Sequence, residues 1–129
     1  MIVVDCTAVI DALTVAPDSG PLRERLAQEE LHAPALLDYE VVSGLRGLVR
    51  GGHLSELRAL EALDDFEDLP VQRWQGAGGL RRRVFQLRHN LSAYDGAYVA
   101  LAESLDCTLV TRDRRLARAA GHDARMEVW

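Results

Sequence analysis

The sequence has no lysine, because all 15 of its basic residues are arginine, so any mechanism that needs a lysine is excluded. It also lacks an apolar run close to the roughly 20 residues of a membrane-spanning helix. Its first residues show neither the basic segment nor the cleavable apolar stretch of a signal peptide. We therefore expect a cytoplasmic protein without a membrane partner.

Cysteine is scarce, and neither Cys6 nor Cys107 has the spacing of a metal site. We expect both to be reduced and buried as small apolar side chains. The chain also lacks a long linker, a low-complexity tract and an internal repeat. With 48% hydrophobic residues in 129 positions, it is expected to form a single domain, residues 1–129, around one core.

An excess of positive charge is missing as well. The formal net charge is -5 at pH 7, which argues against a protein that holds nucleic acid through a general basic field. Contact with nucleic acid would have to depend on a few local arginines.

The chain does contain an alternation of strand-like and helix-like segments. Expected strands lie at residues 3–4, 31–34, 68–73, 107–111 and 125–129. Expected helices lie at residues 7–15, 21–29, 34–50, 54–64, 80–88, 92–105 and 114–121, with Thr7 and Ser92 as caps and Pro34 as an opening residue. This alternation favours an α/β fold with a parallel sheet covered by helices on both faces.

Two acids follow strands of that sheet. Asp5 comes directly after Val4, and Asp113 lies two residues after Thr111, the end of the apolar stretch CTLVT. In parallel sheets, ligands bind beyond the carboxyl ends of the strands. Both acids are therefore expected near a binding edge.

Two more acids lie beside the expected core faces of helices. Glu40 is three residues from Leu37 and four from Gly44, on or beside the apolar face of its helix. Asp95 lies in the first turn of a helix whose expected buried stripe comprises Tyr94, Tyr98, Leu101 and Leu105. Such positions are unusual for acids, because carboxylates are almost never fully buried without a partner.

Each acid alone has a purely structural explanation. Asp95 completes Ser-x-x-Asp with Ser92, which is close to a capping box. Asp5 could form an Asx turn, Asp113 could start a turn before a helix, and Glu40 could extend to the edge of its helix. No single residue decides between these explanations and a functional one.

Together the four acids favour a metal site. At about 4 Å and an effective dielectric near 20, each like-charge pair would cost about 4 kcal/mol, and a divalent cation reverses that sign. Carboxylates and water are the ligands that Mg²⁺ and Mn²⁺ prefer. Setting the four acids aside also changes the net charge from -5 to -1, so much of the chain's acidity could belong to one pocket.

Other charged side chains are expected to lie outside this pocket. A cluster of Arg81, Arg82, Arg83 and Arg88 is interpreted as a solvated helix face, with phosphate contact as the alternative. Four histidines have no ligand spacing and are expected at the surface or in turns: His32, His53, His89 and His122.

Three segments carry a resemblance to a known family: IVVDCTAVIDAL at 2–13, PALLDYEVVSGL at 34–45 and LSAYDGAYVALAESLDCTLVTRDRRLARAAG at 91–121. They resemble the PIN-domain ribonucleases, specifically the VapC toxins of bacterial toxin–antitoxin pairs. The chain departs from the family at Cys6, where a small hydroxyl residue is common. The resemblance implies a three-layer α/β/α PIN domain with a central parallel sheet of about five strands.

The resemblance also implies site residues and partners. The acidic positions that bind metal and act in catalysis are Asp5, Glu40, Asp95 and Asp113, supported by the hydroxyls of Thr7 and Thr111. Arginines next to Asp113 would contact RNA: Arg112, Arg114 and Arg115. The family implies an Mg²⁺- or Mn²⁺-dependent endoribonuclease toxin that forms a homodimer. A cognate VapB-type antitoxin would silence the toxin, and DNA would be reached only through that antitoxin.

Two alternatives compete with this function. Receiver domains and haloacid-dehalogenase-type phosphatases also place an acid after the first strand. Receivers usually need a later lysine, however, and the phosphatase motif needs an aspartate where Thr7 stands. The second alternative is a PIN-like binding or scaffold module without nuclease activity. Its signature would be the loss of one or more of the four acids, and none is missing.

Overall fold

One parallel sheet organises the molecule. A computed structural model describes all residues, 1–129. Its strands are β1 (Ile2–Val4), β2 (Leu31–Pro34), β3 (Val71–Trp74), β4 (Thr108–Thr111) and β5 (Arg125–Val128). They lie in the order β3-β2-β1-β4-β5, and every neighbouring pair is parallel. The predicted α/β class and the five parallel strands are therefore confirmed.

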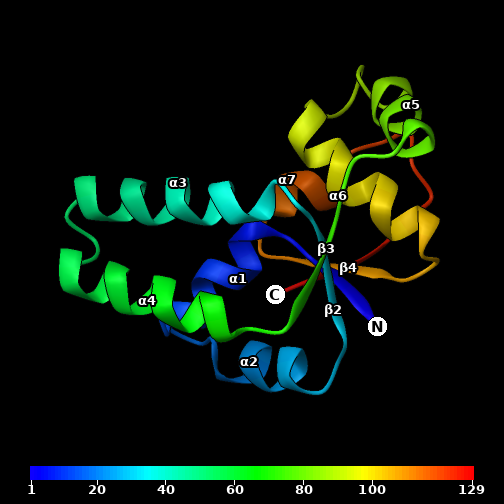
Figure 1. Ribbon diagram of the computed structural model, residues 1–129. Helices are drawn as coiled ribbons and strands as arrows, with labels where there is room; N and C mark the ends of the chain where they lie inside the picture. Colours follow the sequence, from blue (N-terminus) through cyan, green and yellow to red (C-terminus); the bar gives the residue numbers. More distant parts are fainter.

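Helices form a layer on each side of this sheet (Figure 1). The helices are α1 (Cys6–Leu13), α2 (Gly20–Ala27), α3 (Leu37–Arg50), α4 (Glu56–Asp68), α5 (Gly78–Gln86), α6 (Ala93–Ser104) and α7 (Arg114–Ala117). Helices α1 to α4 lie on one side, and α5 and α6 lie on the other. Parallel strands need such crossovers, because a tight turn cannot join two strands that run in the same direction.

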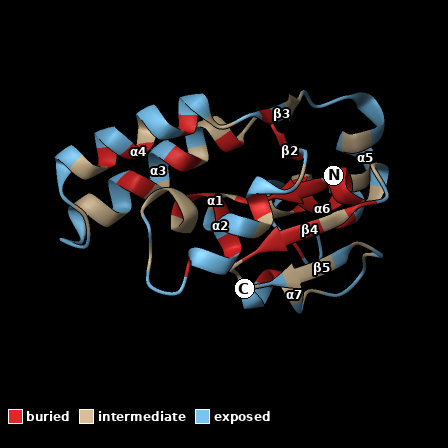
Figure 2. Cartoon of the chain, turned by 90° about the horizontal axis from the view of Figure 1, so that it is seen from below, coloured by how far each residue is buried: buried red, intermediate tan, exposed pale blue.

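The core lies where β1 and β4 meet α1 and α6 (Figure 2). β1 is entirely buried, and so are Leu109 and Val110 of β4 and Val99 of α6. Both faces of these strands are covered, so their residues form continuous apolar runs instead of alternating with polar ones. Each fully buried Val or Leu side chain contributes about 1.5–3 kcal/mol to folding.

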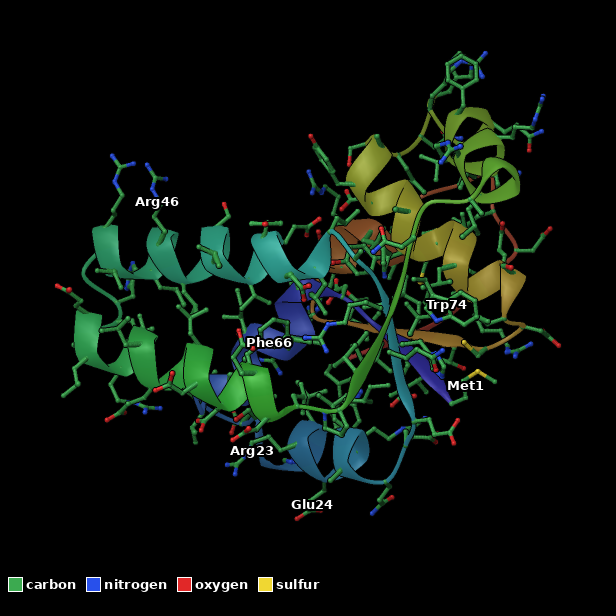
Figure 3. All side chains as sticks on the ribbon, in the orientation of Figure 1. Met1, Arg23, Glu24, Arg46, Phe66 and Trp74 are labelled. Atoms are coloured by element: carbon green, nitrogen blue, oxygen red, sulfur yellow. The ribbon has the colours of Figure 1, made fainter.

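Helices α3 and α4 lie side by side and project beyond the sheet (Figure 1). Phe66 of α4 and Trp74 of β3 lie toward the interior, whereas Arg46 extends from α3 into solvent (Figure 3). None of the helices in the chain has the length and apolar character needed to cross a bilayer.

Two helix starts differ from the predictions. Asp5, and not Thr7, is the N-cap of α1, because its carboxylate accepts the backbone N–H of Ala8. Pro34 does not open a helix but ends β2. The N–H of the next residue, Ala35, donates to the carbonyl of Trp74 at 2.9 Å, which extends the strand pairing past Pro34. Helix α3 therefore begins only at Leu37.

Several predictions of burial were wrong. Tyr94 is 68% exposed, because it lies in the first turn of α6, while Tyr98 one turn later is buried. His32 is not a surface residue: it is buried in β2, where its Nδ1 accepts a hydrogen bond from Trp74 Nε1 at 3.0 Å. Both cysteines are free; Cys107 is buried as expected, whereas Cys6 is only partly buried.

Candidate functional site

The four predicted acids all belong to segments that begin at the carboxyl edge of the sheet. Asp5 follows β1 and caps α1, and Asp113 follows β4 and caps α7. Glu40 lies in the first turn of α3, which follows β2, and Asp95 lies in the first turn of α6. The positive ends of the dipoles of α1, α3 and α6 therefore face these carboxylates and stabilise negative charge there.

Asp5 is the most enclosed of the four acids. It is 5% exposed, and its Oδ1 accepts hydrogen bonds from Thr7 Oγ1 at 2.7 Å and from the Ala8 N–H at 2.9 Å. Its Oδ2 accepts a hydrogen bond from Thr111 Oγ1. Burial raises the pKa of Asp5. The three hydrogen bonds act against that rise, the nearby charge of Asp113 adds to it, and the pKa stays above its ordinary value.

The two predicted threonine hydroxyls connect Asp5 to the end of β4. Thr111 Oγ1 donates to Asp5 and accepts the backbone N–H of Asp113 at 2.9 Å. Thr7 Oγ1 donates to Asp5 and accepts the backbone N–H of Arg112 at 2.9 Å. Because each hydroxyl has both a donor and an acceptor partner, the two threonines fix the orientation of the Asp5 carboxylate.

Glu40 is the acid with the largest pKa change. Burial raises its pKa to about 7, the charges of Asp95 and Asp5 add to the rise, and the Tyr98 hydroxyl acts in the opposite direction. Glu40 Oε1 is buried, and it does not meet hydrogen-bond geometry with Tyr98 or with any other group of the protein. Asp5, Glu40 and Asp95 are therefore close enough to influence one another.

The Arg115 guanidinium lies near both Asp113 and Asp95. Guanidinium nitrogen Nη2 of Arg115 lies 3.4 Å from Asp113 Oδ2 and 3.9 Å from Asp95 Oδ2. Asp113 Oδ1 accepts the backbone N–H groups of Arg115 and Leu116. Burial acts to raise the pKa of Asp113, but these backbone bonds and the Arg115 side chain outweigh it, so the pKa lies below its ordinary value.

The predicted RNA-contact arginines differ in their surroundings. Arg115 is 84% exposed in its side chain and faces the acids. Arg114 is also exposed. Arg112 is instead held by Asp11, with Nε 2.6 Å from Asp11 Oδ2. Arg114 and Arg115 are therefore more accessible to a ligand than Arg112.

The acids fit a hard divalent cation by chemistry, although their side chains are not arranged around one. No three Asp, Glu, His or Cys side chains of the chain are placed to hold a single metal ion together. Asp113 is turned toward the amides of α7 and Arg115. The buried, unpartnered Oε1 of Glu40 and the carboxylate of Asp5 are nonetheless oxygen ligands of the kind that Mg²⁺ and Mn²⁺ prefer.

Two neighbours of the acids were not predicted as site residues. Cys6 follows Asp5, and burial together with the charges of Glu40 and Asp5 raises its pKa to about 12, so the thiol stays protonated. Tyr98 was predicted only as a core residue. It lies three residues after Asp95, and this helical spacing could have placed it on the same side as the acid.

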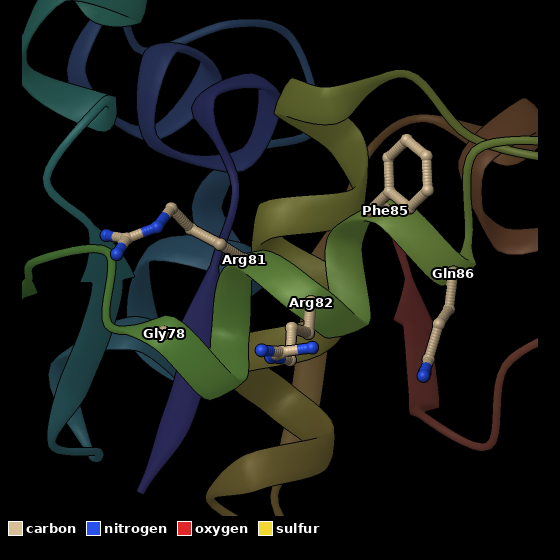
Figure 4. A pocket seen from close by; sticks show the side chains of 5 residues that line it. All are labelled: Gly78, Arg81, Arg82, Phe85 and Gln86. Atoms are coloured by element: carbon tan, nitrogen blue, oxygen red, sulfur yellow. The ribbon is translucent and has the colours of Figure 1, made fainter.

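A hollow of about 500 Å³ lies on α5 and contains part of the other arginine cluster (Figure 4). Its lining is Gly78, Arg81, Arg82, Phe85 and Gln86. The Arg81 and Arg82 side chains point in different directions. In the same cluster, Arg83 pairs with Glu103. This arrangement fits the interpretation of a solvated helix face.

Comparison with known proteins identifies relatives over nearly the whole chain. Residues 2–122 match the family described as PIN domain. The chain is 46% identical to ribonuclease VapC9 of Mycobacterium tuberculosis over 116 residues, which cover 90% of this chain and 88% of the relative. It is 39% identical to ribonuclease VapC12 of the same organism over 128 residues, which cover 99% and 98%.

A solved structure shares the fold. VapBC2 from Rickettsia felis, crystallised with a DNA fragment from its promoter, aligns with a TM-score of 0.70 and 16% identity. The alignment covers 100% of this chain and 99% of the other. At this identity the likeness concerns the arrangement of the sheet and helices alone.

Proposed function

We propose a function from the premise that this chain belongs to the PIN-domain family and, within it, to the VapC ribonucleases. The protein is an endoribonuclease that hydrolyses RNA phosphodiester bonds, and it acts as the toxin of a toxin–antitoxin pair. Its active site is the acidic pocket formed by Asp5, Glu40, Asp95 and Asp113.

One observation carries this proposal. Asp5, Glu40 and Asp95 are close enough that the charges of Asp5 and Asp95 help to raise the pKa of Glu40 to about 7, after burial. Burying acids beside one another is unfavourable unless a proton or a cation offsets their charge. Strongly shifted acids at the carboxyl edge of a parallel sheet are typical of a functional site.

Mg²⁺ or Mn²⁺ bound by these acids would polarise a phosphate oxygen and favour ionisation of an attacking water. Asp5 is held in place for this role by Thr7 and Thr111. Glu40 would add a carboxylate oxygen to the ligands of that cation. Arg114 and Arg115 would contact RNA phosphates at the rim.

The proposal includes partners. We expect the protein to work in the cytoplasm, where its RNA would be found, and to be silenced by a VapB-type antitoxin. The VapBC2 structure from Rickettsia felis is one precedent for such a pair. We also expect a homodimer. Tyr39 and Val42 support it, because they lie one helical turn apart on α3 and are both exposed.

The first prediction is that Asp5→Asn abolishes RNA cleavage. The exchange keeps the size of the side chain but removes a charged oxygen ligand, so cleavage with Mn²⁺ should fall at least about 100-fold. The variant should stay folded, because burial already disfavours the ionised form of Asp5. Cleavage is measured on total RNA by mapping new 5′ ends, and growth arrest is measured after induction in a bacterial host.

The matched control is Asp64→Asn, which changes an exposed acid of α4 outside the pocket. It should cleave and arrest growth like the wild type. Equal cleavage by wild type and Asp5→Asn would indicate a contaminating nuclease and remove support for the pocket. Binding of RNA without cleavage or growth arrest in the wild type would favour the scaffold alternative.

A further inference from the structure

The side chain of Tyr98 buries a hydroxyl beside the acids. Tyr98 is 2% exposed, and its Oη is buried without a hydrogen-bond partner in the protein. Buried polar groups in folded proteins nearly always have a partner. Phenylalanine has nearly the same shape and would fill this space without an unpartnered polar atom. The hydroxyl therefore calls for an explanation other than packing.

A complementary acceptor lies in the same region. Glu40 Oε1 is also buried and also lacks a partner. The charges that act on the Tyr98 hydroxyl, after burial, come from Glu40, Cys6, Asp5 and Asp95 in that order, and they raise its pKa. The hydroxyl of α6 therefore faces the acids, and among them Glu40 affects it most.

Glu40 has no other residue to orient it. Asp5 is held by two threonine hydroxyls and the N–H of Ala8, and Asp113 is held by two amides of α7. Carboxylates that bind metals are usually oriented by hydrogen bonds of this kind. Tyr98 brings a buried hydroxyl donor near Glu40, and its hydrogen remains unused.

We propose that Tyr98 is a positioning residue for Glu40: its O–H donates to one Glu40 oxygen and holds the other oxygen toward a bound divalent cation. This inference rests on the metal pocket proposed above. It predicts that the Tyr98 hydroxyl strengthens metal binding through Glu40 and adds nothing to the stability of the metal-free fold.

The test compares Mn²⁺ binding by the full-length wild type and Tyr98→Phe, using titration calorimetry. Loss of a hydrogen bond that orients a ligand should raise the Kd for Mn²⁺ about 10-fold. The metal-free melting temperature should stay the same or rise, because the exchange removes an unpartnered buried hydroxyl. Tyr94→Phe is the control: this tyrosine lies one turn earlier on α6, is 68% exposed, and should keep the wild-type Kd.

A second pair of variants tests whether Tyr98 acts through Glu40. In a Glu40→Gln background, Tyr98→Phe should change the Kd by less than about two-fold, because the two groups act as one unit. An equal weakening of Mn²⁺ binding in both backgrounds would overturn the inference. A Tyr98→Phe variant that keeps the wild-type Kd but melts at a lower temperature would overturn it as well. Both of these results would leave the metal pocket standing. Absence of Mn²⁺ binding by the wild type would overturn the pocket and the inference together.

Discussion

The carboxylates of Asp5, Glu40 and Asp113 differ in how their surroundings shift their pKa values. Backbone amides and Arg115 keep Asp113 ionised against the effect of burial, and its pKa is lowered. Burial raises the pKa of Asp5 and of Glu40. The pocket therefore combines a stable anion with acids that favour a proton or a cation. This difference makes the behaviour of the pocket depend on pH.

Glu40 should link stability to both pH and metal. Its folded pKa of about 7 lies above the ordinary value of 4.5, so between these pH values the folded state holds a proton that the unfolded state has lost. The free energy of unfolding without metal should therefore fall as pH rises from about 4.5 to about 7. Mn²⁺ competes with that proton, so the rise in melting temperature on adding Mn²⁺ should be larger at pH 8 than at pH 5.5.

Melting curves with EDTA and with Mn²⁺, recorded across this pH range, measure both effects. Glu40→Gln is the control, because glutamine has similar size and does not titrate. Its metal-free stability should decline less over the same range. An identical pH dependence in the wild type and Glu40→Gln would show that Glu40 does not cause it.

At the scale of single residues, the sequence could identify the candidate site residues but not the groups that surround them in the fold. Asp5 and Asp113 were recognisable because they follow apolar strands. Glu40 was recognisable because it interrupts an apolar helix face. The role of Tyr98 was not recognisable, because a tyrosine on an apolar stripe is usually a core residue and only the fold brings it near Glu40. The pairing of Arg112 with Asp11 likewise depends on a contact between distant segments.

At the scale of elements, the position of Glu40 depends on the contact between α1 and α3. A Cβ added at Gly44 would collide with Cδ1 of Ile10, whereas one added at Gly47 would meet open space. Glycine at position 44 therefore leaves room for the end of the Ile10 side chain between α1 and α3. This contact sets how the first turn of α3 is placed relative to Asp5 at the start of α1.

Gly44→Leu should therefore destabilise the fold. Overpacking of this kind typically costs about 1–3 kcal/mol, which exceeds the gain of up to about 1 kcal/mol from replacing a helical glycine. Gly47→Leu is the matched control on the same helix, and it should leave stability unchanged or raise it. Urea unfolding measures both variants. Equal stability of the two would contradict the importance of the Gly44 contact.

Element boundaries were predictable where local chemistry decides them. Ser92 was expected to cap α6, and its hydroxyl accepts the N–H of Asp95 at 3.1 Å. The start of α3 was predicted too early, at Pro34, because proline is common at the first position of helices. In the fold, pairing between β2 and β3 keeps Pro34 in the strand. A contact with a segment 40 residues away in sequence has no local signal.

At the scale of the whole molecule, alternating strands and helices were sufficient to predict a parallel sheet, but not its order. β1 lies at the centre between β2 and β4. This order brings the segments after β1, β2 and β4 to one part of the carboxyl edge, where Asp5, Glu40 and Asp113 are found. The resemblance of the motifs to the PIN-domain family predicted that these acids lie together. The spacing of residues along the sequence does not by itself determine which strands are neighbours.

The exposed face of α3 leads to the last prediction, which concerns assembly. Tyr39 is 82% exposed and Val42 is 46% exposed, and such large apolar side chains are candidates for burial in the proposed homodimer. Val42→Arg would place a charge in that interface and should weaken dimerisation at least about 10-fold. Sedimentation velocity over a range of concentrations measures the change.

Leu57→Arg is the control for this experiment, because Leu57 is 66% exposed but lies on α4. It should leave the dimer intact, which would show that added charge alone does not separate the subunits. Dimerisation of Val42→Arg at the wild-type concentration would place the interface elsewhere. A wild type that stays monomeric at every concentration would contradict the homodimer itself, while leaving the acidic pocket, which is built from one chain, unaffected.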